Sequence, residues 1–301
     1  FNTYQGGTTL KGGTLYDPKD KMLGDSAGGL TLDGGTLRMN TVAISRDITL
    51  ASGGGTFEVP VNLLVIGSVS GAGSLTKTGA GNLYMSGSSS YSGATLIEEG
   101  AIYAFGDSGL SADSAVAISS GASLAIAAGV SSVIGGLSGA GSVALSVTSV
   151  LTVDVADGRT DTFSGVISGD GTFEKEDLGT LVLTGTGSSV NALQVCCGVL
   201  DIQGGGMTVA GDTIVSGGTL KVTAGGSLTT DVLAVGFGME ISGGGGVVVE
   251  DYTQIGVIGG ESLTISGGTL ESKGEAQILG ILGEGMVSVS GSSSEWTIGT
   301  T

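Results

Sequence analysis

Apolar and polar residues alternate along most of the chain in segments of three to five residues. Glycines flank each of these segments, which include residues 30–32, 181–183, 219–222 and 263–265. Alternation with period two predicts short β-strands that bury one face. Only residues 17–23, which contain Pro18, favour a single helical turn. The pattern therefore predicts an all-β protein.

The predicted strands belong to a glycine-rich unit that recurs along the chain. Residues 71–87 read GAGSLTKTGAGNLYMSG, and residues 169–185 read GDGTFEKEDLGTLVLTG. A third copy, GAGSVALSV from Gly139, carries Leu145 at the lysine position. Self-similarity of this kind indicates one supersecondary unit stacked on copies of itself.

A second alignment compares the segments 4–15, 91–102 and 189–200. It places Lys11-Gly12, Glu98-Glu99 and Cys196-Cys197 in one slot, at a corner. A coil of three short strands and their turns needs about 20 residues. Glycine supplies the positive φ that such corners require. We therefore predict a parallel β-helix (β-solenoid), in which inward residues of successive coils form one apolar stack.

The repeat changes character after about Gly206. Shorter units follow, such as TIVSGGTLKV at 213–222 and LTISGGTLES at 263–272, and the lysine-bearing unit does not recur. We place a soft boundary there, with lysine-bearing glycine-rich repeats in residues 1–206. Residues 207–301 are then a continuation of the same β-helix with SGGTL-type repeats.

Two long stretches carry a family resemblance. SGAGSLTKTGAGNLYMSGSSSYSGATLIEEGAIYA and SGVISGDGTFEKEDLGTLVLTG resemble the autotransporter-associated β-strand repeat of bacterial surface proteins. The final third, with SGGTL, LAVGFG and SGSSSEWTIG, resembles a second repeat type of the same passengers. The resemblance implies a passenger that folds as a right-handed β-helix. It also implies export across the outer membrane to the bacterial cell surface.

Composition excludes one class of protein, one class of partner and a membrane-spanning segment. With 61 glycines but only 2 prolines, and no triplet period, the chain is not collagen. A formal net charge of −18 opposes binding to phosphate backbones, so we expect no nucleic-acid partner. No run of 18 apolar residues occurs, so we expect no transmembrane segment.

The sequence contains no histidine, which removes Ser-His-Asp and Cys-His nucleophile systems and histidine metal sites. The strongest enzymatic alternative is a polysaccharide lyase or hydrolase, which would use paired carboxylates. Glu98 and Glu99 do not form such a pair, because adjacent strand residues point to opposite faces. We expect them to be a solvated turn, and we expect no catalysis and no cofactor.

Asp154, Asp157 and Asp161 form the densest polar cluster, in DVADGRTDT. Their spacing is not that of an EF-hand loop. A turn between two strands is the simpler interpretation, and weak surface calcium binding is the alternative.

Lys77 and Lys175 share the parity of Leu75 and Phe173, which we expect to point inward. A buried ammonium group is costly unless it reaches carbonyl or carboxylate oxygens. We therefore interpret both as structural lysines at corners, and the replacement by Leu145 in the third copy favours a structural role.

Cys196 and Cys197 are the only thiols. Because their slot carries Lys11 and Glu98-Glu99 in other copies, we expect at least one thiol to be exposed. A vicinal or an intermolecular disulfide would fit. Trp296 and Tyr91 could stack against sugars, but with so few aromatics we expect ordinary packing.

These observations favour a non-enzymatic extracellular rod that serves adhesion, aggregation or a matrix role. Its partners would be itself, or glycans or proteins of host or cell surfaces. A self-assembling fibre of the same fold and a polysaccharide-active enzyme are the two alternatives.

Overall fold

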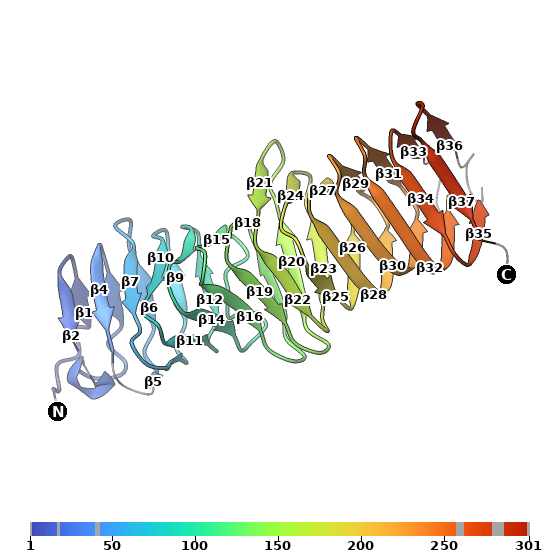
Figure 1. Ribbon diagram of the computed structural model, residues 1–301. Coiled ribbons are helices and arrows are strands. Elements are labelled where there is room, and N and C mark those ends of the chain that lie inside the picture. Colours follow the sequence, from blue (N-terminus) through green and yellow to red (C-terminus); the bar gives the residue numbers. More distant parts are fainter. Residues whose placement is uncertain (1, 17–18, 40–42, 257–261, 279–285, 300–301) are drawn as a thin grey trace. The chain divides into compact units, whose positions relative to one another are not determined.

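The computed structural model describes residues 2–16, 19–39, 43–256, 262–278 and 286–299, in two compact units, Phe1–Leu151 (unit 1) and Thr152–Thr301 (unit 2). Both units consist of short strands that pair in parallel with the strand one coil further along (Figure 1). The all-β parallel β-solenoid predicted from the alternation is therefore confirmed.

The described residues of unit 1 form three sheets. The first contains β1 (Thr8–Leu10), β3 (Leu30–Leu32), β6 (Ile48–Leu50), β9 (Val69–Gly71) and β12 (Ser89–Tyr91). The second contains β2 (Thr14–Tyr16), β4 (Gly35–Arg38), β7 (Gly55–Glu58), β10 (Leu75–Thr78), β13 (Thr95–Ile97), β15 (Val116–Ile118) and β18 (Leu137–Gly139). The third contains β5 (Ala43–Ile44), β8 (Leu63–Val65), β11 (Asn82–Met85), β14 (Ala101–Ala104), β16 (Ser123–Ile126) and β19 (Ser142–Leu145). The unit also holds β17 (Ser131–Ile134).

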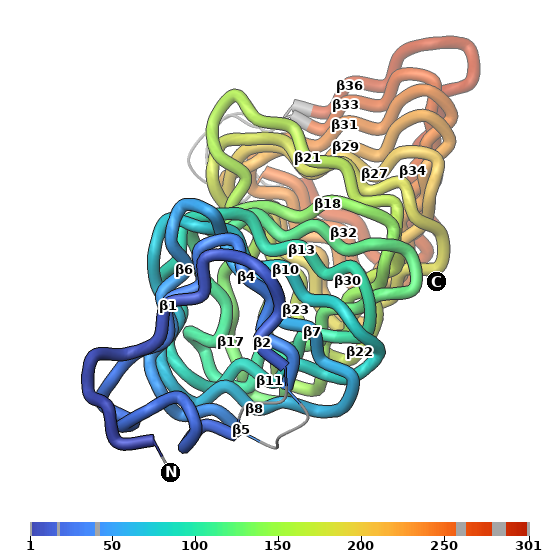
Figure 2. Tube along the Cα trace, turned by 90° about the vertical axis from the view of Figure 1, so that its left-hand side faces the viewer, coloured from blue at the N-terminus to red at the C-terminus, as the bar shows by residue number. Residues whose placement is uncertain are grey.

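Successive coils of unit 1 stack one behind another (Figure 2). In the second sheet Gly55 pairs with Leu75, and Leu75 pairs with Thr95. Each pairing therefore spans one coil, close to the length of about 20 residues predicted from three short strands and their turns.

The core of unit 1 is a set of such columns. In the third sheet the inward column is fully buried and consists of Leu63, Leu83, Ile102, Leu124 and Val143. Burial of one such side chain contributes about 1.5–3 kcal/mol, so the stack is the main stabilising feature of the unit.

Unit 2 is also a parallel solenoid. Its longest sheet contains β21 (Thr160–Phe163), β24 (Thr180–Leu183), β27 (Val199–Gln203), β29 (Thr219–Thr223), β31 (Gly238–Ser242), β33 (Ser262–Ser266) and β36 (Met286–Ser290). The remaining strands are β20 (Val150–Asp154), which begins in the last residues of unit 1, β22 (Val166–Gly169), β23 (Thr172–Glu176), β25 (Ser188–Val190), β26 (Ala192–Val195), β28 (Gly206–Val215), β30 (Ser227–Val235), β32 (Gly246–Ile255), β34 (Thr269–Ser272), β35 (Glu275–Ile278) and β37 (Glu295–Ile298).

Strand length changes at Gly206. The short strands β25 and β26 both pair with the single strand β28, which has ten residues and a register irregularity between Val209 and Asp212. One long strand thus replaces two short ones in the three coils of β28, β30 and β32, and β32 then pairs with the two short strands β34 and β35. The two-part domain division placed at this residue stays a prediction.

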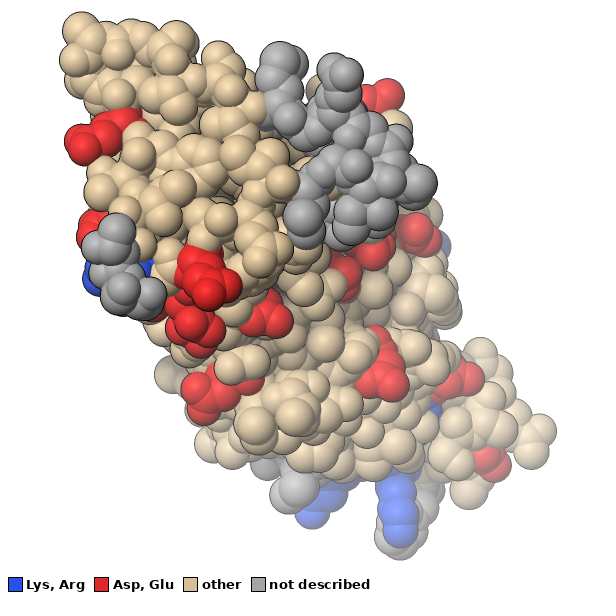
Figure 3. All heavy atoms as spheres, turned by 90° about the vertical axis from the view of Figure 1, so that its right-hand side faces the viewer, with Lys and Arg blue, Asp and Glu red and all other residues tan. Residues whose placement is uncertain are grey.

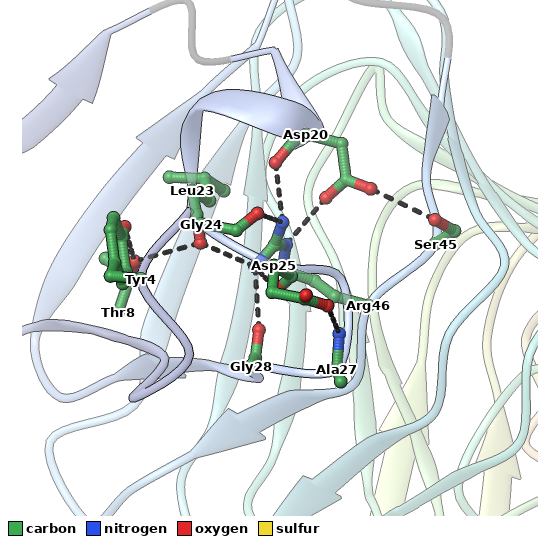
Figure 4. A network of polar contacts seen from close by, with 10 residues as sticks. All are labelled: Tyr4, Thr8, Asp20, Leu23, Gly24, Asp25, Ala27, Gly28, Ser45 and Arg46. Carbon is green, nitrogen blue, oxygen red and sulfur yellow. Dashed lines mark hydrogen bonds and ion pairs between the residues drawn. The ribbon is translucent and has the colours of Figure 1, made fainter. Parts of the chain in front are cut away.

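One loop of unit 1 is held by a buried arginine (Figure 4). The predicted turn near Pro18 is a 3-10 helix over Asp20–Met22, although residues 17 and 18 lie outside the described residues. The side chain of Arg46 is fully buried, and its Nε donates to Asp20 Oδ1 at 2.6 Å. Its two terminal nitrogens donate to the carbonyl oxygens of Asp20, Leu23 and Gly28 at 2.5–2.7 Å. Arg46 therefore fixes the loop that contains the 3-10 helix.

Candidate binding surface

The third sheet of unit 1 carries a column of large side chains on its outer face. Leu64 pairs in register with Tyr84, and Tyr84 pairs with Tyr103. Their neighbours within each strand, such as Leu83 and Met85, are buried. Because successive side chains of a strand point to opposite faces, this column points outward. The solenoid thereby places residues from three consecutive coils side by side.

Two tyrosines and one phenylalanine form an aromatic cluster there. The rings of Tyr84 and Tyr103 stack with centroids 4.9 Å apart and planes at 25°. Phe105, just after β14, meets Tyr84 edge-on at 6.2 Å and 77°. Phe105 is 57% exposed. An aromatic side chain so accessible at the end of a strand is a candidate contact for a partner.

Asn62, Leu64, Tyr84 and Phe105 line an open hollow of about 240 Å³. Its wall is almost entirely apolar, and Asn62 contributes the one amide side chain among these four residues. The backbone N–H of Asn82 donates to Asn62 Oδ1 at 3.3 Å, and Asn82 Nδ2 donates to the Tyr84 hydroxyl at 3.4 Å. We call Asn62, Leu64, Tyr84, Tyr103 and Phe105 the aromatic face.

The sheet beneath the aromatic face is uncharged. None of its strands β5, β8, β11, β14, β16 and β19 contains Asp, Glu, Lys or Arg, although the chain carries a net charge of −18. Elsewhere acidic groups are frequent, and the face in Figure 3 shows several separate groups of Asp and Glu side chains. The strands that carry the aromatic face are therefore uncharged, in a protein with a strong net negative charge.

The sequence predicts ordinary packing for two other aromatic residues, Tyr91 and Trp296. Tyr91 is fully buried, and its hydroxyl hydrogen-bonds Thr95 Oγ1 at 2.7 Å. Burial raises the pKa of Tyr91 to about 12. Trp296 is half-buried, and its Nε1 donates to Ser272 Oγ at 3.2 Å. Both pack as expected. The sequence feature that could have identified the aromatic face is the spacing of Tyr84 and Tyr103, which are outward residues one coil apart.

Lys77 is fully buried in β10, between Phe57 and Ile97 of the adjacent coils. Its Nζ donates to the carbonyl oxygens of Thr78, Gly79 and Glu99 at 3.0, 2.7 and 2.9 Å. Burial lowers the pKa of Lys77 to about 8, against the opposing charge of Glu99. The ammonium group thus joins two consecutive coils at one corner.

Lys175 has the same arrangement in unit 2. It is fully buried, and its Nζ donates to the carbonyl oxygens of Glu176 and Asp177, the latter at 2.7 Å. Asp177 has a φ of 59°, and the equivalent Gly79 has a φ of 77°. Each lysine therefore binds the carbonyl of a residue with a left-handed backbone.

Leu145 does not lie at the corner of Lys77. Leu145 belongs to β19 of the third sheet, whereas Lys77 belongs to β10 of the second. The two copies begin at Gly71 and Gly139, a separation that is not a whole number of coils. Lys175 also lies outside the sheet of β10, because its strand β23 pairs with β26 of another sheet. The match of Leu145 to the lysine position therefore stays a prediction.

Cys196 and Cys197 are free and half-buried, with their Sγ atoms 3.4 Å apart. They directly follow Val195, which pairs with Lys175, as Glu98 and Glu99 follow Ile97, which pairs with Lys77. The hydrogen bond between the thiols and burial raise the pKa of Cys196 to about 11. At neutral pH this thiol is protonated and weakly nucleophilic. A vicinal or intermolecular disulfide stays a prediction.

The three aspartates proposed for calcium lie in different environments. Asp161 forms a two-pronged ion pair with Arg159, at 2.8 and 2.6 Å. Asp157 is exposed, and Asp154 is half-buried at the end of β20. No group of three or more acidic or cysteine side chains in the described ranges could hold a metal ion. Surface calcium binding stays a prediction.

Asp154 lies instead near Glu174 and Glu176 of β23. Burial and the charges of Asp177 and Glu174 raise the pKa of Asp154, against Lys175. Burial and the charges of Glu174 and Asp154 raise the pKa of Glu176, again against Lys175. Both carboxyl groups are therefore less stable in their charged form in the folded protein.

This cluster predicts a pH effect on stability. Because the folded state binds protons at higher pH than the unfolded state, the free energy of unfolding falls as pH rises above the ordinary pKa of 3.8. Asp154→Asn is expected to stabilise the protein at pH 7.5, and this gain should shrink toward pH 4. Urea unfolding across that range measures it. A gain that is constant with pH would contradict the assignment.

Comparison with known proteins adds the biological class. Residues 1–16, 75–102 and 198–222 match the passenger-associated-transport-repeat family. Over 107 residues the chain is 43% identical to the adhesin BmaC autotransporter of Brucella suis biovar 1 (strain 1330). The match covers 34% of this chain and only 3% of that protein. No solved structure matches the chain.

The chain thus carries autotransporter passenger repeats, as its resemblance implied. These findings indicate a polypeptide exported across the outer membrane to the bacterial cell surface. In the described part of the chain, no helix has the length and apolarity needed to cross a membrane.

Proposed function

We propose that the chain is part of a non-enzymatic, adhesin-type passenger, and that the aromatic face of unit 1 is a contact surface for a partner on another surface. The observation that carries this proposal is the exposed Phe105 beside the Tyr84–Tyr103 stack on an uncharged sheet. The similarity to an autotransporter adhesin supports the class of function.

The physical chemistry of the face suits adhesion. Aromatic side chains dominate the binding energy of many interfaces, and charged groups are depleted at the centre of such interfaces. β11 pairs with β8 on one side and β14 on the other, so the rings of Tyr84 and Tyr103 lie on paired strands of the sheet. A rigid face loses little conformational entropy on binding.

Cell attachment tests this proposal. Beads coated with the chain are expected to attach to cultured mammalian cells, and Tyr84→Ser with Phe105→Ser should abolish most attachment. Phe237→Ser is the matched control, because Phe237 is a 37% exposed aromatic in unit 2. Equal attachment of the double variant and the control would refute the role of the aromatic face. Circular dichroism checks that each variant is folded.

Self-association through the same face, into aggregates, matrix or fibres, is the alternative within this class. Light scattering would then detect oligomers of the wild-type chain that are absent in the Phe105→Ser variant.

One observation favours a polysaccharide-active enzyme as a second candidate function. The raised pKa values of Asp154 and Glu176 are of the kind that a general acid requires. Release of reducing ends from neutral or acidic glycans, lost in Glu176→Gln, would support that function.

A further inference from the structure

We infer that the aromatic face binds a neutral sugar ring, a hexopyranose at the end of a surface glycan, in the hollow between Leu64, Tyr84 and Phe105. The inference rests on the proposed adhesive function and names the chemical class of its partner. Three properties of the face carry it, namely the size of the hollow, its chemistry and its charge.

The hollow admits one ring. Its volume of about 240 Å³ is below the roughly 300–1,000 Å³ of pockets for drug-sized ligands. Leu64 lies one coil before Tyr84, and the Phe105 ring is nearly perpendicular to the Tyr84 ring at 77°. The Tyr84 and Phe105 rings therefore form two walls that meet at an angle. A sugar ring that lies against the face of one aromatic ring contacts the other ring with its edge.

The lining matches the two kinds of surface on a pyranose. Such a ring has an apolar face of C–H groups and a border of hydroxyls. Tyr84 and Phe105 offer apolar faces, while the Asn62 amide and the Tyr84 hydroxyl offer hydrogen bonds. Asn62 is exposed, and only its Oδ1 has a partner among the residues that the structure describes. Its Nδ2 can therefore donate to a sugar hydroxyl.

Charge selects a neutral sugar over an acidic one. The strands of this sheet carry no basic residue that could pair with a carboxylate or sulfate. A net charge of −18 repels anionic glycans and also opposes the approach of a second copy of the chain. A neutral ring approaches without this penalty.

The face fits a peptide or a folded protein less well. A peptide strand has no sheet edge to join here, because β11 pairs on both sides. The aromatic face contributes only five residues, whereas a stable protein interface uses about 20–30 residues on each side.

Saturation-transfer NMR with methyl glycosides tests the inference. Millimolar methyl β-D-glucopyranoside, β-D-galactopyranoside and α-D-mannopyranoside are the neutral probes, and methyl β-D-glucuronide is the acidic one. At least one neutral probe is expected to receive saturation and the glucuronide none. Phe105→Ser or Tyr84→Ser should weaken binding by about tenfold or more, as expected for loss of an aromatic contact. Phe237→Ser and Tyr16→Ser should leave it unchanged.

Three results would overturn the inference. These are no saturation of any neutral probe, preference for the glucuronide, and binding unaffected by Phe105→Ser. Attachment to cells stripped of surface glycans distinguishes failure of the sugar-binding inference from failure of the proposed adhesive function. If stripped cells still bind wild-type beads but not the Tyr84→Ser, Phe105→Ser beads, the face is adhesive and its partner is a protein. If the double variant attaches like wild type to all cells, the adhesive role itself fails.

Discussion

Replacing Arg46 with Met is expected to lower the free energy of unfolding of unit 1 by about 3–5 kcal/mol, the usual cost of removing one partner from a buried ion pair. The guanidinium binds Asp20 Oδ1 and the carbonyl oxygens of Asp20, Leu23 and Gly28. Met fills a similar volume but donates no hydrogen bond. The carbonyl oxygens and a carboxylate then lose their donors.

Urea unfolding followed by circular dichroism measures this loss, and hydrogen exchange locates it. Faster exchange is expected in residues 19–28, which Arg46 holds. Arg38→Met is the matched control, because Arg38 pairs with Glu58 at 2.6 Å while about one-third exposed. Its loss should be within about 1 kcal/mol. Equal losses in the free energy of unfolding for the two variants would contradict this prediction, because burial of Arg46 would then add nothing to the stability that its hydrogen bonds provide.

The second large effect is expected for Lys77→Met, which should lower the free energy of unfolding by about 2–3 kcal/mol. Three carbonyl oxygens converge on the Lys77 ammonium, and two of them lie in the turn that contains Gly79 with φ of 77°. Without a donor, this corner exposes unsatisfied acceptors to the core. Lys221→Met is the control, since Lys221 forms a partly exposed pair with Glu240.

The pH dependence distinguishes the lysine from a mere packing residue. The pKa of Lys77 falls from 10.5 to about 8 in the folded protein, so the folded state releases its proton first. The free energy of unfolding should therefore gain a contribution as pH rises from 8 to 10.5. Lys77→Met should lack that gain. Identical slopes in the variant and the wild type would contradict the assignment.

Much of the fold follows from simple periodicity. Alternation with period two predicted the strands, and repeated glycines predicted the corners. At Gly71, whose φ is 114°, an added Cβ would lie 2.1 Å from the carbonyl oxygen of Leu50 in the preceding coil. Parity also placed Lys77 and Lys175 on the inward side, and both are buried. These features depend on local chain geometry, which a short sequence motif specifies.

The phase of the repeats around the solenoid could not be predicted in the same way. The opening glycines Gly71 and Gly139 end β9 of the first sheet and β18 of the second. Turn lengths determine where a coil closes, and they vary independently of the motif. For this reason the copies that begin at Gly71, Gly139 and Gly169 lie in different sheets.

The aromatic face depends on the same phase. Tyr84 and Tyr103 meet because their strands pair in register, and Phe105 joins them from the turn after β14. No single repeat contains the cluster, so a motif search along the chain does not find it. Comparing outward residues one coil apart would have paired the two tyrosines.

Competition by the soluble chain tests the central claim most directly. Attachment of wild-type beads to cells should fall as soluble wild-type chain or the Phe237→Ser variant is added. The soluble Tyr84→Ser, Phe105→Ser variant should not compete, because it lacks the proposed contact surface. If that variant competes as well as the wild type, the aromatic face of unit 1 is not the adhesive surface.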